Sequence, residues 1–138
     1  ICFKLIGMSS ASYKIEKKEN FTLISLLENN FTAKVSPQLK ADLVVLKDEG
    51  VKNIIFDLEA TSYCDSSGLS VILVANRISK ENSGCLVICN LKPAVEKLID
   101  ISQLSNILNI TPTLNEAVDF LFMDEVERGL NGGEGSMN

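Results

Sequence analysis

The stretch NIIFDLEATSYCDSSGLSVILVANRISKE, residues 53–81, decides the fold class of this chain. Residues 53–58 form a short and nearly continuous apolar run, which is typical of a strand buried on both faces of a parallel sheet. From residue 66 to about residue 81, apolar side chains recur at three- and four-residue spacings, which predicts a helix. The stretch therefore predicts a strand, a connecting loop and a helix of an α/β fold.

Upstream of this stretch the same two kinds of element are expected. Two short strands lie within residues 11–27, and Glu19-Asn20 offers the turn of a hairpin between them. Ser36 and Pro37 form a helix-start signature, with an N-cap residue followed by proline at the first helical position. That helix ends near Gly50.

Downstream the alternation continues. The sequence predicts a buried strand at 85–89, a helix at 92–101 with a proline near its start, and a strand at 106–110. Thr113 and Glu116 form a capping box that opens the last helix. The order is β-β-α-β-α-β-α-β-α, so we expect a single α/β domain with a mixed, mostly parallel sheet of about five strands and about four helices.

Composition limits the function classes. The 138 residues are 46% apolar and carry a net charge of −5 without a basic cluster, so direct nucleic-acid binding is not expected. The apolar start, ICFKLIG, is too short for a secretion signal or a membrane span, and we expect a cytoplasmic protein without membrane insertion. We expect an N-terminal extension at 1–10, the domain at 11–127, and a disordered tail at 128–138, where GLNGGEGSMN is glycine-rich.

The cysteines, Cys2, Cys64, Cys85 and Cys89, form no C-x-x-C pair, and the chain has no histidine. A zinc site of the common kinds is therefore not expected, and we interpret all four cysteines as reduced thiols. The chain also lacks the glycine-rich loops of the two standard nucleotide sites. No metal or cofactor is predicted.

The segment CDSSG, residues 64–68, has both a structural and a functional interpretation. Asp65 and Ser66 are good N-cap residues, and Gly68 permits a tight turn from strand to helix. Alternatively, Ser66 or Ser67 is a modification site at the ligand-facing edge of the sheet, where a helix N-terminus tolerates a phosphate and Gly68 lets a partner's backbone come close. The residues alone leave both interpretations open.

Catalysis is a weaker alternative for this segment. A serine nucleophile needs a base, and a Ser-His-Asp arrangement is impossible without histidine. Asp57 and Asp65 could bracket a metal ion, but a strand-end aspartate and a helix cap explain them more simply.

Five pieces of the chain resemble a STAS domain, in particular the bacterial anti-sigma factor antagonists. The pieces are a buried strand, a loop with Asp-Ser-Ser-Gly-Leu, an apolar helix, a second buried strand after a glycine turn, and a Pro-x-Val helix. In this chain they read IIFDL, CDSSGLS, SVILVANRI, SGCLVICN and KPAVEKLI, and the resemblance covers about residues 12–122. It implies the STAS fold, a mixed sheet with helices packed against it.

The resemblance also implies a function. In that family the second serine of the motif, here Ser67, is phosphorylated by a partner that is both a serine kinase and an anti-sigma factor. The unphosphorylated domain binds this partner and releases a sigma factor, whereas the phosphorylated domain does not bind. The protein would then be a binding module and not an enzyme. The partner-binding residues that the resemblance implies are Asp65, Ser66, Ser67, Gly68, Asn30 and Thr32.

The chain departs from the family pattern at three places. Residues 29–32 read NNFT where Gly-x-Leu-Asp is usual, and they begin the loop 29–36, which contributes to the family's partner surface. Ser70 stands where a second glycine is common. Cys64 stands where a larger apolar residue is usual. The identity of the partner therefore stays open. The alternative is a STAS subunit of a lipid-transport or stress-sensing assembly whose serine is not phosphorylated.

Overall fold

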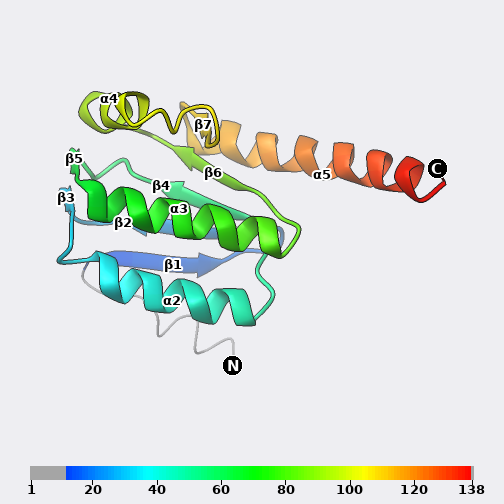
Figure 1. Ribbon diagram of the computed structural model, residues 1–138, viewed down its shortest axis with the longest axis horizontal. Helices are drawn as coiled ribbons and strands as arrows, with labels where there is room; N and C mark the ends of the chain where they lie inside the picture. Colours follow the sequence, from blue (N-terminus) through cyan, green and yellow to red (C-terminus); the bar gives the residue numbers. More distant parts are fainter. Residues whose placement is uncertain (1–11, 138) are drawn as a thin grey trace.

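The computed structural model describes the backbone of residues 12–137 and the side chains of residues 12–127. The strands are β1 (Tyr13–Lys17), β2 (Thr22–Leu26), β3 (Asn30–Phe31), β4 (Ile54–Asp57), β5 (Tyr63–Cys64), β6 (Leu86–Cys89) and β7 (Asn109–Thr111). The helices are α2 (Ser36–Asp48), α3 (Ser66–Glu81), α4 (Pro93–Ile101) and α5 (Leu114–Met137). Figure 1 shows α2 and α3 side by side over the sheet, and α5 running away from it.

Five strands form one sheet in the order β1-β2-β4-β6-β7. β1 and β2 pair antiparallel as a hairpin, and every other neighbouring pair in this sheet is parallel. The predicted α/β class, the mixed and mostly parallel sheet, the hairpin and the element order are therefore confirmed. The last strand lies at Asn109–Thr111, slightly later than the predicted 106–110.

Two apolar clusters explain why the strands are buried on both faces. Along β4 the side chains alternate, so that Ile54 and Phe56 join the large cluster under α2, α3 and α4, whereas Ile55 joins a smaller cluster with α5. In β6 the same alternation places Ile88 in the first cluster and Val87 in the second. The near-continuous apolar runs in the sequence thus reflect helices on both sides of the sheet.

A second, very small sheet joins β3 to β5 in parallel, with Phe31 opposite Cys64. The sequence did not predict these strands, because two residues are too few to show a periodic pattern. The sheet connects the loop after β2 to the loop after β4, which are far apart in sequence. It therefore brings the two predicted partner-binding segments together.

The predicted start of α2 needs correction. The N-cap of α2 is Val35, and Ser36 is the first helical residue. The Ser36 hydroxyl donates to Thr32 O at 2.9 Å, so this serine joins the helix to the preceding turn instead of capping it.

The C-terminal segment also differs from the prediction. The sequence predicted a disordered tail at 128–138, but α5 continues to Met137. A helix that is already nucleated by packing is extended by one hydrogen bond per residue, and this partly offsets the low helix propensity of glycine. The predicted extension at 1–10 lies outside the described residues.

Candidate functional site

The first turn of α3 holds the predicted serines, and Asp65 caps it. Asp65 adopts an extended backbone conformation, and its Oδ1 accepts hydrogen bonds from Ser67 N–H at 2.9 Å and Gly68 N–H at 3.2 Å. These are two of the N–H groups that a helix leaves without an internal partner. The structural interpretation of Asp65 is therefore correct, and the cap also fixes the position of Ser67.

The small sheet β3–β5 fixes the loop that leads into this cap. Ser62 N–H and Tyr63 N–H donate to Asn29 O at 2.9 and 3.1 Å, and Asp65 N–H donates to Phe31 O at 3.2 Å. Every one of these bonds links the loop after β4 to the loop after β2. Exposed Asn30 and half-buried Thr32 therefore lie in the segment that is bonded directly to the approach to Ser67.

Gly68 has an internal packing role. It is buried, and a Cβ atom built on it would lie 2.6 Å from both Cys64 Sγ and Phe31 O. Even a methyl group would overlap the small sheet. The residue thus lets α3 begin close to β3 and β5. The sequence predicted either a tight turn from strand to helix or a partner's approach at Gly68, and it did not predict this contact.

A groove of about 390 Å³ lies beside Ser67, between the first turns of α2 and α3. The serine is half-buried, whereas Ser66 is exposed. Both line the groove together with Ala33, Ser36, Pro37, Lys40 and Ser70. Ser67 is therefore partly exposed and lies at the wall of an open groove.

Five of the lining residues were not among the predicted site residues, namely Ala33, Ser36, Pro37, Lys40 and Ser70. Ser36 and Lys40 lie four residues apart, and Ser67 and Ser70 lie three apart, so each pair shares one face of its helix. That spacing was visible in the sequence. The approach of the two helix faces to each other was not, because it depends on tertiary packing.

The carboxylates and thiols near this end of the sheet have structural roles. Asp57 Oδ1 accepts from Glu59 N–H at 3.0 Å and from the Asn90 side-chain amide at 3.1 Å. Burial, and secondarily the charge of Asp65, raises the pKa of the Cys64 thiol to about 12. This thiol is protonated at neutral pH and is a poor nucleophile.

Neither a metal centre nor a membrane span is evident in the part of the chain that the structure describes. Within it, no three side chains of the metal-binding types gather closely enough to hold an ion. Its helices also include none with the length and apolar character needed to cross a bilayer. Among the described residues, Cys64, Cys85 and Cys89 form no disulfide.

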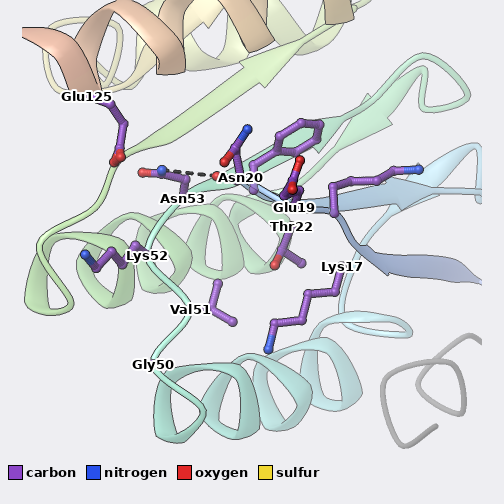
Figure 2. Close-up of a pocket in the computed structure, with 11 residues that line it drawn as sticks. Lys17, Glu19, Asn20, Thr22, Gly50, Val51, Lys52, Asn53 and Glu125 are labelled. Carbon is purple, nitrogen blue, oxygen red and sulfur yellow. Dashed lines mark hydrogen bonds between the residues drawn. The ribbon is translucent and has the colours of Figure 1, made fainter. Parts of the chain in front are cut away.

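A second hollow, of about 280 Å³, lies at the opposite end of the sheet, before β2 and β4 (Figure 2). Lys17, Lys18 and Lys52 line it, together with Asn53 and Glu125. The Asn53 side chain is used internally, since its amide donates to Asn20 O at 3.3 Å and its Oδ1 accepts from Cys85 N–H at 3.1 Å. This hollow is therefore a polar seam between the hairpin, β4 and α5.

Comparisons with known proteins agree with the fold described above. A family profile described as STAS domain matches residues 12–117. A Bordetella bronchiseptica protein named as a candidate anti-sigma factor antagonist, BtrV, is 33% identical over 93 residues, which are 67% of this chain and 78% of that protein. The anti-sigma-B factor antagonist of Bacillus subtilis is 33% identical over 76 residues, which are 55% of this chain and 69% of that protein.

Solved structures also match. The structure of the Bacillus cell fate determinant SpoIIAA in its phosphorylated form superposes with a TM-score of 0.63 at 25% identity, over 78% of this chain and 96% of that one.

Proposed function

The chain belongs to the STAS domain family, in the group of the anti-sigma factor antagonists, and on this premise we propose that Ser67 is its phosphorylation switch. Unphosphorylated, the protein binds an anti-sigma factor that is also a serine kinase, and a sigma factor is released. Phosphorylation of Ser67 by that kinase ends the binding. Anti-sigma factor antagonists are non-enzymatic, so ATP and magnesium belong to the kinase. The exchange takes place in the cytoplasm.

The observation that carries the proposal is the position of Ser67 on an accessible groove wall. Ser67 is half-buried and its backbone N–H is held by the Asp65 cap, so a kinase meets the residue in one fixed place. The exposed side chains of Asn30, Tyr63 and Ser66 lie on the segments around it, and Tyr63 is 53% exposed. A large exposed aromatic ring beside small polar residues is suited to a protein interface. Thr32 and Asp65 complete the proposed surface, while buried Gly68 positions it.

Electrostatics explain how the switch works. A phosphoserine carries about −1.5 to −2 charges at neutral pH, and at residue 67 it would lie next to the Asp65 carboxylate. A docking partner would have to remove water from both anions. A loss of about 3 kcal/mol in binding free energy corresponds to more than a hundredfold in affinity. The phosphate need not change the fold to prevent binding. One solved relative, SpoIIAA, is described in both an unphosphorylated and a phosphorylated form, which supports a fold that tolerates the modification.

The proposal is tested with the tagged full chain purified from its own cells. We expect phosphopeptide mass spectrometry to find phosphate on Ser67 in the wild type. We also expect an ATP-binding serine kinase to co-purify with the Ser67→Ala variant and to be lost, by at least about tenfold, with Ser67→Asp. Ser70→Ala, on the same groove wall, is the matched control and should retain the kinase. The proposal fails if Ser67→Asp retains the kinase, or if a transporter ATPase co-purifies instead.

A further inference from the structure

The groove beside Ser67 contains one charged side chain, Lys40. The six other lining residues are serines, an alanine and a proline. Lys40 lies in the second turn of α2, and it is half-buried, so part of its stem is packed while its ammonium can reach the groove. A lysine carries its charge on a flexible four-carbon stem, which lets it reach a group across a groove of this size.

Lys40 has no ion-pair partner among the described residues. The four ion pairs found there use Lys14, Lys17, Lys18 and Lys47. Lys47 is informative because it lies seven residues after Lys40, on the same face of α2, and pairs with Glu81 of α3 at 3.0 Å. A lysine on this face of α2 can therefore reach α3. Where Lys47 meets a carboxylate, Lys40 shares its groove only with uncharged residues.

The N-terminus of α3 is already occupied by an anion. The two N–H groups nearest to Ser67, its own and that of Gly68, donate to Asp65 Oδ1. A phosphate on Ser67 would therefore find them engaged and would be repelled by the Asp65 carboxylate. The expectation that this helix end alone accommodates a phosphate is incomplete, because the cap has taken up its donors. A cation from outside α3 is needed to offset the added charge.

From these observations we infer that Lys40 is the intramolecular counter-ion of the phosphate on Ser67. The inference rests on the proposed function for the identity of the modified residue. In the unphosphorylated protein the groove carries about +1 from Lys40, and that charge is available to a partner carboxylate. Phosphorylation adds about −1.5 to −2, so the groove becomes negative by about −0.5 to −1. The modification thus repels a partner and also withdraws the cation that attracts it.

The experiment uses full-length protein with phosphoserine inserted at position 67 during translation, so that no kinase is required. The probe is the phosphate itself, whose second ionisation is followed by phosphorus NMR as the pH is varied. The Asp65 carboxylate faces the phosphate in every variant, so its effect cancels in the differences. Because a nearby cation stabilises the dianion, we expect Lys40→Met to raise the pKa of the phosphate by about 0.2 to 0.7. The difference should shrink in high salt.

Two variants separate a charge effect from a structural one. Lys40→Arg keeps the positive charge and should titrate within about 0.1 of the wild type. Lys34→Met removes an exposed lysine that does not line the groove and should leave the titration unchanged. An unchanged pKa in Lys40→Met, or an equal change in Lys34→Met, would overturn the inference.

The titration and the kinase-binding experiment can fail separately. If no kinase recognises Ser67, the proposed function fails, while the titration still shows whether Lys40 pairs with a phosphate at that position. If the kinase binds as proposed but Lys40→Met titrates like the wild type, only the counter-ion role is lost.

Discussion

The two ends of the parallel sheet both carry polar hollows with lysines, but they are built differently. At the amino end, Lys17 pairs with Glu49 at 3.8 Å and Lys18 pairs with Glu16 at 3.9 Å. The side-chain amide of Asn53 both donates and accepts a hydrogen bond. Asn53 holds the hairpin to the start of β4, since its side-chain amide donates to Asn20 O (Figure 2) and its backbone carbonyl accepts from Thr22 N–H. At the carboxyl end, the groove beside Ser67 combines several hydroxyls with the single charge of Lys40.

The difference shows that the number of lysines does not identify a site. The amino-end hollow has three lysines against one in the groove, yet two glutamates also line it. Lys17, Lys18 and the Asn53 side chain already have partners within the chain. The carboxyl-end groove has a single lysine, and one of its hydroxyls, that of Ser36, already donates to Thr32 O. Lys40 and the serines of α3 remain available to an added group. The loops that follow parallel strands are also where ligands are usually met in open α/β sheets.

The largest expected effect on the free energy of unfolding comes from replacing one glycine at each end of the sheet. A Cβ on Gly84 would lie 1.9 Å from the carbonyl oxygen of Lys52, so Gly84→Ala must displace backbone and should lower the free energy of unfolding by about 3 kcal/mol. A Cβ on Gly68 would meet Phe31 O and Cys64 Sγ at 2.6 Å, which is a smaller overlap than at Gly84, so Gly68→Ala should cost about 2 kcal/mol. Urea unfolding measures both.

Gly50→Ala is the control for these two glycines. Gly50 has φ +81° and nothing within 4 Å of the position that an added methyl group would take, so the substitution costs about 1 kcal/mol from backbone strain alone. Equal losses at all three glycines would contradict the packing argument. Kinase binding should be weakened by Gly68→Ala and retained by Gly84→Ala, because Gly68 sets where α3 and Ser67 begin.

Alkaline pH should weaken the carboxyl end through its thiols. Burial, with smaller effects of nearby carboxylates, raises the pKa of Cys64 and of Cys89 to about 12, against 9.0 for an unperturbed thiol. Unfolded thiols therefore ionise first, and stability that is complete below pH 9 is lost as the pH rises toward 12. We expect the free energy of unfolding to fall by about 1 kcal/mol per thiol between pH 8 and pH 10.

The double variant Cys64→Ala and Cys89→Ala checks this assignment. Its own loss of stability at pH 7 is taken as the baseline, and urea unfolding is repeated at higher pH. The variant should lose about 2 kcal/mol less than the wild type between pH 8 and pH 10. If the free energy of unfolding of the double variant falls with pH as steeply as that of the wild type, other groups cause the alkaline loss. Tyr13 is one such group, because burial and Asp42 raise its pKa.

The sequence predicts more of the fold than of the candidate site. The runs at 53–58 and 85–89 carried enough pattern to identify buried strands, because each is apolar on both faces. The cap at Asp65 was also predictable, since capping is local chemistry. In α2 the apolar pattern predicts the buried face only in part. Leu39, Leu43 and Leu46 are buried, but Val44, which the same pattern includes, is 52% exposed.

The contacts that make the site were not predictable in the same way. Phe31 meets Gly68 and Cys64 through two strands of two residues each, and neither strand has a periodic pattern of its own. Lys40 reaches the groove only because α2 packs against α3. Such features depend on pairings across more than 25 residues of sequence, which propensity and spacing do not encode.

The smallest effects compare single charged residues at the two ends. Asp65→Ala removes the acceptor of two backbone N–H groups and should lower the free energy of unfolding by about 1 kcal/mol, whereas Asp65→Asn, which can still cap, should cost less. Lys17→Gln breaks only a long, partly exposed ion pair with Glu49 and should cost less than about 0.5 kcal/mol. Urea unfolding at pH 7 in low and high salt separates them, because the ion pair is screened by salt and the cap is affected little. A loss at Lys17 equal to that at Asp65 would show that the amino-end charges stabilise the fold as strongly as the helix cap. The difference between the amino end, two of whose lysines are paired within the chain, and the carboxyl end, whose groove can accept an added group, would then rest on geometry alone.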